Sequence, residues 1–312
     1  MTILVTGGAG YIGSHLIESL KSDEVVIILD NYPSSHYRHF SPQTIYIQGD
    51  IRNAKTLRKI FKKYDIGTVY HLAALKSVTD SIQNPKIFRD INISGTQSLL
   101  EALPKNVIFI FASSASVYGN SQSKTILSEQ DSTHPLSPYG EVKLVGEKLV
   151  SDWNGKSAAL RLFNVAGKSK NLAVSFNNQT VLPKYAKLLK NDQSLAVWGK
   201  TFETHDGTAV RDYVHVFDVV QAMKTSAEYL VQQKLPTAKK WNVCTSVGTS
   251  MNELIGEFVT ASGKTPKIEY LSPMPGEIDF SVGDYSLISK ETGWKPRFGI
   301  SEIVKSEWES SA

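Results

Sequence analysis

The fold is decided near the N-terminus by Ile3-Leu4-Val5-Thr6-Gly7-Gly8-Ala9-Gly10-Tyr11-Ile12-Gly13, in which an apolar run leads directly into glycines spaced three residues apart. Gly7 permits a tight turn, Gly10 lets a ligand approach the backbone, and Gly13 lets the following helix pack closely on its strand. The N–H groups at the start of such a helix face phosphate groups, and the helix dipole favours their negative charge. The stretch therefore predicts a strand, a glycine turn and a helix that together hold the pyrophosphate of a dinucleotide.

Strand-like and helix-like segments alternate along the first half of the chain. We expect strands at Thr2–Val5, Val25–Leu29, Ile45–Ile47, Thr68–His71, Val107–Phe111 and Ala158–Leu162. We expect helices near Tyr11–Leu20, Ala54–Tyr64, Pro85–Ala102 and Pro138–Trp153. This alternation predicts an α/β fold with a doubly wound parallel sheet of the Rossmann type, covered by helices on both faces.

The regular alternation ends near Gly167, where a polar segment and scattered prolines and glycines follow. At 312 residues the chain is long for one compact core and suits one large domain with a smaller one. We therefore expect residues 1–167 to form a dinucleotide-binding domain. Residues 168–312 are expected to form a smaller α/β substrate domain, with some segments returning to the first domain.

The composition argues against several classes of function. The net charge of +4 comes from dispersed basic residues, which favours a small anionic ligand and argues against nucleic acid. No apolar run approaches the roughly 18 residues that a membrane span needs. Cys244 is the only cysteine and the N-terminus does not resemble a signal peptide, so we expect a cytoplasmic protein. No metal site is expected because His71, His205 and His215 lack metal-ligand spacing, and we expect His71 to be a packed neutral imidazole.

Asp30 closes the second predicted strand, about 20 residues beyond the glycine turn. A carboxylate there accepts hydrogen bonds from the hydroxyls of the adenosine ribose and repels a 2′-phosphate, which favours NAD over NADP. In the alternative interpretation Asp30 only belongs to the turn that includes Asn31. Gly49-Asp50-Ile51 follows the third strand and either flanks the adenine or forms an ordinary turn.

Tyr139 and Lys143 stand four residues apart at the start of a predicted helix, so their side chains share one helix face. An ammonium about 4–5 Å from a phenol favours the phenolate by roughly 3–4 kcal/mol, which lowers the tyrosine pKa by about two to three units. The pair is then a general base suited to hydride transfer between a nicotinamide and an alcohol carbon. Ser113-Ser114 follows the fifth strand, and a hydroxyl there can bind the same substrate oxygen. The alternative is a core tyrosine that happens to precede a lysine by four residues.

Further motifs extend along nearly the whole chain, at Gly7–His15, Ala73–Lys76, Ser113–Gly119, Pro138–Lys143, Phe163–Gly167, Asp206–Val216, Pro275–Glu277 and Gly293–Pro296. With these motifs the chain resembles the UDP-glucose 4-epimerases of the extended short-chain dehydrogenase/reductase superfamily. The resemblance implies an isomerase of galactose metabolism that holds NAD tightly and epimerises a UDP-hexose at C4 through a transient 4-keto sugar. It also implies a homodimer built from helices near Pro85–Ala102 and Pro138–Trp153.

The same resemblance implies roles for individual residues. Tyr139 would take the proton of the sugar 4-hydroxyl, Ser114 would orient the 4-oxygen, and Lys143 would hold the nicotinamide ribose while polarising Tyr139. The implied coenzyme-binding residues are Gly7, Gly10, Tyr11, Ile12, Gly13, Asp30, Asn31, Asp50, Ile51, Lys76, Asn92, Tyr139 and Lys143. The implied substrate-binding residues are Ser114, Tyr139, Asn164, Thr180, Trp198, Arg211 and Ser281. Within this set Asn164 and Arg211 would contact the diphosphate and Trp198 the uracil, although Arg211 alone also suits a surface ion pair with Asp212.

Several positions depart from the family pattern. Met274 stands where the epimerases commonly carry an arginine, Leu162 replaces an aromatic residue, and Thr180 replaces an asparagine. Ser281 is small and stands where a side chain walls the sugar pocket. We therefore expect room for an N-acetyl group and activity on UDP-GlcNAc or UDP-GalNAc.

Two positions separate this chain from other members of the superfamily. Related dehydratases and decarboxylases tend to carry an acidic residue where this chain has Ala115 and Ser116. Simple redox chemistry at C4 is therefore expected rather than elimination. The alternatives are a 4-epimerase of another UDP sugar (N-acetylated, pentose or uronic acid) and a non-catalytic NAD-binding sensor of the same fold.

Overall fold

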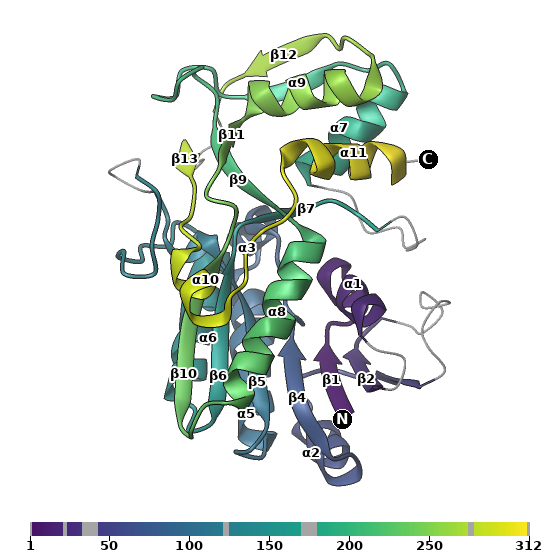
Figure 1. The fold of residues 1–312 in the computed structure, drawn as a ribbon, viewed down its shortest axis with the longest axis vertical. Helices are drawn as coiled ribbons and strands as arrows, with labels where there is room; N and C mark the ends of the chain where they lie inside the picture. Colours follow the sequence, from purple (N-terminus) through teal and green to yellow (C-terminus); the bar gives the residue numbers. More distant parts are fainter. Residues whose placement is uncertain are drawn as a thin grey trace.

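A computed structural model describes residues 2–20, 24–32, 43–120, 125–169, 180–273 and 278–310. Met274 and the Pro275–Glu277 motif lie outside the described residues. Figure 1 shows a large sheet in the lower part of the molecule and a group of helices and short strands above it.

The large sheet has seven strands in the order β10-β6-β5-β4-β1-β2-β3, and all of its neighbouring pairs are parallel. Its strands are β1 (Thr2–Thr6), β2 (Val25–Asp30), β3 (Thr44–Gln48), β4 (Ile66–His71), β5 (Ile108–Ser114), β6 (Lys156–Leu162) and β10 (Thr237–Val243). The order reverses between β1 and β4, which is where a doubly wound sheet binds its ligand. The predicted doubly wound parallel sheet is confirmed.

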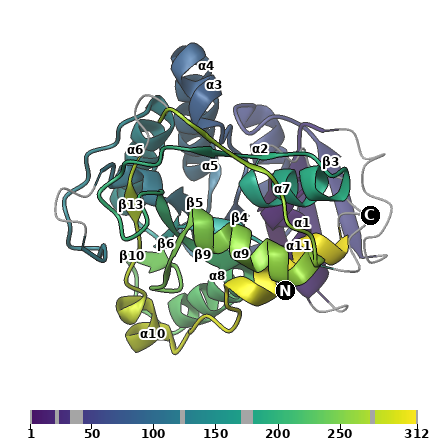
Figure 2. The same ribbon diagram turned by 90° about the horizontal axis from the view of Figure 1, so that it is seen from above.

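Helices cover both faces of the large sheet because each face presents apolar side chains. One core contains residues of α1 (Tyr11–Ser19), α8 (Val216–Val231) and α10 (Ser286–Thr292). The other contains residues of α2 (Ala54–Lys63), α5 (Gly95–Ala102) and α6 (Pro138–Asp152). Seen from above, α8 and α10 lie on one side of the strands and α5 and α6 on the other (Figure 2).

The prediction of a single helix over Pro85–Ala102 is wrong in the middle of that range. The structure has α4 (Pro85–Arg89), a π-helical turn at Asp90–Ser94, and then α5. Asn92 lies in that wider turn, and its side chain is bonded to the backbone of Leu75 in the loop after β4. A short helix, α3 (Val78–Gln83), follows that loop. The π-helical turn brings Asn92 to a neighbouring loop. The regular spacing of apolar residues in the sequence could not indicate this turn.

A second sheet stands at the carboxyl edge of the large one. We call β7 (Asn164–Ala166), β9 (Val210–His215), β11 (Gly248–Ser250) and β13 (Phe280–Ser281) the small sheet. We call α7 (Val181–Lys190), β8 (Leu195–Trp198), α9 (Met251–Ser262), β12 (Ile268–Leu271) and α11 (Ile300–Ser310) the cap, which packs around its own apolar core. β10, α8 and α10 follow residue 167 in sequence but pack with the large sheet.

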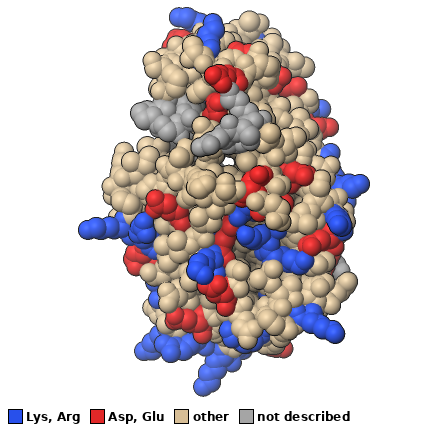
Figure 3. Space-filling model, turned by 90° about the vertical axis from the view of Figure 1, so that its left-hand side faces the viewer, with Lys and Arg blue, Asp and Glu red and all other residues tan. Residues whose placement is uncertain are grey.

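Charged side chains are mixed over the surface. The face in Figure 3 carries Lys and Arg next to Asp and Glu rather than one continuous basic band. Among the described residues, no helix combines the length and the apolar character that crossing a membrane requires.

Candidate active site

The glycine turn between β1 and α1 is built as the sequence predicts. Gly7 has φ +69°, and a Cβ on it would lie 2.6 Å from the backbone nitrogen of Ala73. A Cβ on Gly13 would lie 2.5 Å from the carbonyl oxygen of Gly7, so α1 could not approach the turn as closely. Gly10 is exposed at the N-cap of α1 and has no side chain to cover the helix N-terminus. These are the properties of a cradle for a pyrophosphate.

Asp30 ends β2 beside this turn. Its carboxylate accepts hydrogen bonds from the backbone nitrogens of Ala9 (2.8 Å) and Tyr32 (3.1 Å), so it is tied to the glycine turn itself. Burial raises the pKa of Asp30, and the backbone hydrogen bonds oppose that shift. Each carboxylate oxygen has a second lone pair available for a ribose hydroxyl. Asn31, the next predicted coenzyme residue, is exposed.

The remaining predicted coenzyme residues follow β3 and β4. Asp50 is paired with Arg52, while the side chain of Ile51 is buried against Gly95 of α5. Asn92 accepts from the nitrogen of Leu75 (2.8 Å) and donates to its carbonyl (2.9 Å). Asn92 therefore holds the loop that carries Lys76, a residue that lies exposed beside it.

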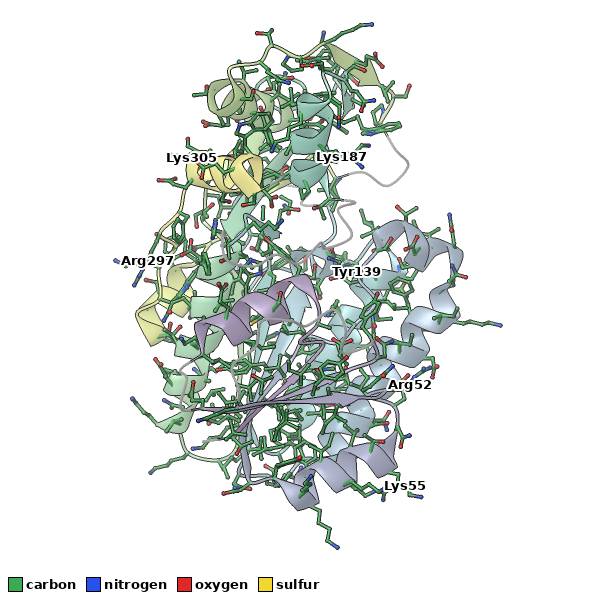
Figure 4. All side chains as sticks on the ribbon, turned by 90° about the vertical axis from the view of Figure 1, so that its right-hand side faces the viewer. Arg52, Lys55, Tyr139, Lys187, Arg297 and Lys305 are labelled. Atoms are coloured by element: carbon green, nitrogen blue, oxygen red, sulfur yellow. The ribbon has the colours of Figure 1, made fainter. Side chains whose placement is uncertain are left out.

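Tyr139 and Ser114 meet at the carboxyl end of β5. Ser137 caps α6 by accepting a hydrogen bond from the nitrogen of Gly140 (3.2 Å), and Tyr139 is in the first turn of that helix. The hydroxyl of Ser114 lies near enough to the phenol of Tyr139 to lower its pKa by hydrogen bonding, and the same hydroxyl is 3.1 Å from that of Ser116. Figure 4 places Tyr139 between the cap, marked by Lys187 and Lys305, and the large-sheet region marked by Arg52. The fold therefore brings this serine and this tyrosine together.

Lys143 is buried one turn further along α6. Its Nζ donates to the carbonyl oxygen of Ala112 (2.7 Å) and lies 5.0 Å from the ring centre of Phe111 and 5.9 Å from that of Tyr139. The ammonium is therefore near the tyrosine ring, as the spacing predicts, but its hydrogen bond goes to the strand. Burial lowers the pKa of Lys143 to about 8, and the negative charge of Glu147 opposes that shift.

The predicted lowering of the Tyr139 pKa is wrong for the protein alone. Burial raises the pKa of Tyr139 above its ordinary value because the phenolate loses hydration, and the hydrogen bond with Ser114 reverses this only in part. The sequence argument took the Coulomb attraction of Lys143 at full strength and left out the cost of burying the phenolate. A further positive charge next to the phenol is needed before it becomes a strong base near neutral pH.

Three of the predicted substrate residues share one face of the small sheet. Asn164 of β7 lies opposite Tyr213 of β9, and Ser281 of β13 lies opposite Arg211 of β9. Residues two apart on a strand point the same way, so Arg211 and Tyr213 share a face. Asn164 and Ser281 share it with them, and the Asn164 amide also donates to the carbonyl of Asp212 (3.2 Å).

The alternative of a surface ion pair between Arg211 and Asp212 is wrong. Asp212 has no exposed surface. Its carboxylate accepts hydrogen bonds from the nitrogen (2.8 Å) and hydroxyl (2.7 Å) of Thr245 and from the nitrogen of Ser246 (2.9 Å). Asp212 thus fixes the loop after β10, while Arg211 points to the opposite face of β9.

The other predicted substrate residues lie in the cap or at the start of its first helix. Trp198 ends β8 with 38% of its surface exposed and pairs with Leu271 of β12. Thr180 is exposed at the N-cap of α7. The cap therefore presents an exposed aromatic ring at Trp198 and an exposed helix start at Thr180.

His71 is a packed neutral imidazole, as expected. It is buried, with Nδ1 2.7 Å from the Thr6 hydroxyl and Nε2 2.9 Å from the Thr96 hydroxyl. Burial lowers its pKa to about 3. Within the described ranges, no group of three His, Cys, Asp or Glu side chains could hold a metal ion.

The sequence reasoning missed a buried polar network beneath the tyrosine and lysine. Glu147 of α6 accepts hydrogen bonds from the Ser113 hydroxyl (2.6 Å) and from Arg161 Nε (2.9 Å) and Nη2 (2.8 Å). Glu147 lies four residues beyond Lys143, so the helical spacing that identified the pair could also have identified this carboxylate. Its partner Arg161 lies on β6, which the spacing along α6 cannot reveal.

A parallel sheet with a glycine turn after its first strand, and Ser114, Tyr139 and Lys143 at its carboxyl edge, defines a short-chain dehydrogenase/reductase of the extended type. A family model described as GDP-mannose 4,6 dehydratase matches residues 4–307. The UDP-glucose 4-epimerase of Rhizobium leguminosarum bv. trifolii is 33% identical over 99% of this chain and 96% of its own. That of Drosophila melanogaster is 32% identical over 98% of this chain and 95% of its own.

Solved structures give the same result. The structure of a UDP-glucose 4-epimerase from Stenotrophomonas maltophila with NAD and formylated UDP-arabinopyranose has a TM-score of 0.92 at 33% identity, covering 100% of this chain and 98% of that one. The enzyme of Bifidobacterium longum with NAD+ and UDP has a TM-score of 0.87 at 30% identity, covering 99% and 98%. The chain belongs to the UDP-glucose 4-epimerase family.

Proposed function

We propose that this protein is an NAD-dependent epimerase that interconverts UDP-glucose and UDP-galactose at C4. One observation carries the proposal. Ser114 and Tyr139 lie together at the carboxyl end of β5, and Lys143 is one helical turn beyond Tyr139. The glycine turn lies at the same edge of the large sheet, and the small sheet presents Asn164, Arg211 and Ser281 beside it. Relatives that match the whole chain at about a third identity are named for this reaction.

The coenzyme site fits NAD better than NADP. The cradle needs glycine at positions 7 and 13, because a side chain at either position would clash with the backbone of Ala73 or of Gly7. Asp30 would accept hydrogen bonds from the ribose hydroxyls, and its charge would repel a 2′-phosphate. Bound there, NAD supplies an acceptor for the hydride from sugar C4 and a positive ring near the phenol.

The catalytic proton moves at the oxygen of Tyr139. Its phenol would take the proton of the sugar 4-hydroxyl as C4 is oxidised and return a proton to the 4-oxygen when C4 is reduced on its other face. The Ser114 hydroxyl would hold the 4-oxygen in reach of the phenol. Lys143 would bind the nicotinamide ribose and keep a positive charge within one helical turn of the phenolate.

The small sheet would hold the part of the substrate that does not react. A guanidinium such as Arg211 suits a diphosphate because it donates several parallel hydrogen bonds and keeps its charge. Asn164 would bind the same group and Trp198 would stack on the uracil. Anchoring at the diphosphate leaves the 4-keto sugar able to rotate and present its other face. Residues 1–167 with β10 and α8 would thus serve the coenzyme, and the cap and small sheet the UDP sugar.

The residues after Ser114 favour epimerisation over dehydration. Elimination of a hydroxyl needs an additional acid or base close to C5 and C6 of the sugar. The two residues that follow Ser114 are Ala115 and Ser116, and the Ser116 hydroxyl is 3.1 Å from that of Ser114. Neither can act as a carboxylate, so the 4-keto sugar would be reduced again rather than dehydrated.

The N-acetylated sugars are a second proposed substrate class. Ser281 lies opposite Arg211 in the register of β13 and β9, which puts a short side chain next to the proposed diphosphate anchor. A small residue at this point leaves space for an N-acetyl group. One solved relative, from Campylobacter jejuni, is named as a UDP-Glc/GlcNAc 4-epimerase.

We also propose that two copies form a homodimer through α3, α4 and α6. Val78 and Ile82 of α3, Ile87 of α4 and Val145 of α6 are apolar and exposed. The three helices pack against one another, and α3 and α4 project from the same side of the large sheet as α6 (Figure 2). A second copy of the same face would cover these side chains in a symmetric contact made by the same three helices of each copy.

We also propose that the protein is located in the cytoplasm. The chain has a single cysteine, Cys244, which is buried as a free thiol. UDP sugars and NAD are cytoplasmic metabolites, so the proposed reaction has its substrates there. Fractionation of cells that produce the protein tests this point.

The test is incubation of the purified protein with UDP-glucose, UDP-galactose, UDP-GlcNAc, UDP-xylose and UDP-glucuronic acid, with the products read by NMR. Inversion at C4 of UDP-glucose and UDP-galactose is expected, with UDP-GlcNAc as a slower substrate. Inversion of only a pentose or uronic acid would reassign the substrate. Bound NAD with no reduction and no product for any sugar would identify a sensor and contradict the proposal.

A further inference from the structure

A buried carboxylate lies below the catalytic residues. Glu147 is 3% exposed and stands four residues beyond Lys143 and eight beyond Tyr139 on α6, so the three side chains lie along one helix face. Its Oε1 accepts from the Ser113 hydroxyl, and both of its oxygens accept from Arg161. One side chain thereby joins α6, the end of β5 and β6 at the point where Ser114 and Lys143 are presented.

The surroundings of Lys143 give Glu147 a specific electrostatic role. From β5 the Nζ meets the carbonyl of Ala112 and the ring of Phe111, and from β4 it faces His71, which is neutral at pH 7. From α6 it faces Tyr139 and Glu147, and Arg161 of β6 lies behind that carboxylate. Among the described residues that act on Lys143, only Glu147 carries a negative charge. Burial lowers the pKa of Lys143, and the charge of Glu147 opposes that shift.

We propose that Glu147 is a positioning residue for the C4 oxidation, keeping Lys143 charged by its own charge and fixing Ser114 through the hydroxyl of Ser113. The inference rests on the proposed function for its meaning in turnover, but the charge of Glu147 acts on Lys143 whether or not substrate is bound. A buried ion pair is a weak source of stability, because desolvation cancels most of the attraction between the charges. The Glu147–Arg161 pair therefore calls for a reason beyond stability, and the neighbouring lysine provides one.

The alternative is that the pair only holds α6 against β6. Breaking it from either side would then have the same consequence. Glu147→Gln and Arg161→Gln both remove the ion pair, so both would lower the melting temperature and move the pH dependence of turnover together or not at all. In the proposal the two variants act oppositely on Lys143. Losing Glu147 removes an attractive charge, whereas losing Arg161 removes a repulsive one.

The experiment is a mutant cycle of wild type, Glu147→Gln, Arg161→Gln and the double variant, with kcat measured from pH 6 to 10. Glu147→Gln should lower the pH at which kcat declines on the alkaline side by about one unit, both in the wild type and in the Arg161→Gln background. Arg161→Gln should leave that limb in place or move it up. If one single variant does not fold, the effect of the same substitution is measured by comparing the double variant with the other single variant. Equal shifts in both single variants, or none, would overturn the proposal.

A readout without substrate separates this inference from the proposed function. Lysines labelled with 13C at Cε can be titrated by NMR, with the Lys143 signal assigned by its loss in Lys143→Met. The midpoint of that signal should fall by about one pH unit in Glu147→Gln and should not fall in Arg161→Gln. An unchanged midpoint in Glu147→Gln would refute the inference even if the protein is a good epimerase. Absence of turnover in wild type would refute the proposed function but leave this titration decisive for Glu147.

Discussion

The large sheet and the small sheet position their site residues in different ways. On the large sheet the predicted residues sit at the ends of successive strands or one turn apart on α6, so each is placed by a few neighbouring residues. On the small sheet Asn164, Arg211 and Ser281 come from segments far apart in sequence and meet only because β7 and β13 pair with β9.

This difference follows the chemistry that each part would perform. Hydride and proton transfer need reacting atoms held to within a fraction of an ångström, which a buried helix on a parallel sheet can supply. A diphosphate and a sugar that must rotate need anchoring at one end and space at the other. Variants of the large sheet should therefore affect kcat or coenzyme retention, and variants of the small sheet should affect KM.

The largest effect is expected from Tyr139→Phe, which removes only the oxygen that moves the proton. The value of kcat should fall by roughly 10²–10⁴-fold, since general acid–base groups contribute rate factors of that size. Bound NAD, read from the absorbance of the purified protein, should remain. Tyr185→Phe is the matched control because it removes another buried phenol oxygen, which donates to the carbonyl of Ala196 (2.6 Å) in the cap, away from the proposed chemistry. Near-normal turnover of Tyr139→Phe would remove this residue from the mechanism.

Asp30→Ala tests the coenzyme side of the comparison. Loss of the charged acceptor for the ribose hydroxyls should weaken NAD binding by roughly 30- to 150-fold, from about 2–3 kcal/mol of charge-assisted hydrogen bonding. With NAD in excess, kcat and the KM for the UDP sugar should stay close to wild type. Equilibrium dialysis with NAD measures the change. Tight retention of NAD in this variant would show that the carboxylate serves only the turn with Ala9.

Arg211→Met tests the small sheet, where we expect an effect on substrate binding and none on NAD binding. Removing the guanidinium should raise the KM for UDP-glucose by roughly 10- to 30-fold, the size of a charge-assisted contact to phosphate. Retention of NAD should not change, because Arg211 lies on the small sheet. Arg297→Met, at an exposed arginine, is the control. A loss of NAD retention in Arg211→Met would break the division between the two sheets.

The pH dependence of kcat reports the charge of Lys143. Its pKa is lowered to about 8 by burial, so the lysine is charged below that pH and neutral above it. The phenolate loses its neighbouring cation as the pH rises through 8, and kcat should fall about tenfold from pH 7 to 9. Initial rates in buffers of constant ionic strength give the profile. A plateau that continues to pH 10 would mean that the lysine charge is not needed.

The smallest effect is expected from Ser281→Tyr. A bulky side chain opposite Arg211 should lower kcat/KM for UDP-GlcNAc by roughly 5- to 10-fold relative to UDP-glucose, since one added group in a pocket shifts specificity by about 1–3 kcal/mol. Ser281→Ala should leave the ratio unchanged. Equal losses for both sugars would place Ser281 away from the N-acetyl group.

The sequence predicts well whatever depends on local spacing. The glycine turn, the Asp30 carboxylate at the end of β2 and the four-residue interval between Tyr139 and Lys143 all lie within short segments, and the structure has each one. Pairing between distant strands has no such local signal, so the shared face of Asn164 and Ser281 could be reached only through family resemblance.

The degree to which each side chain is buried is the second property that the sequence could not predict. The direction of the Tyr139 pKa depends on how much water the fold excludes, which no spacing encodes. The π-helical turn at Asp90–Ser94 likewise depends on the contact of Asn92 with a loop from a different segment. Glu147 was within reach of the helical spacing, but its meaning depends on Arg161 across the sheet.

The most direct measurement follows the hydrogen on C4. UDP-glucose carrying deuterium at C4 is converted in ordinary water, and the UDP-galactose formed is examined by NMR and mass spectrometry. If the hydride leaves C4 and returns to the same carbon within one turnover, the product keeps its deuterium at C4. Product with hydrogen from water at C4, or unchanged UDP-glucose after prolonged incubation with NAD present, would contradict oxidation and reduction at a single closed site.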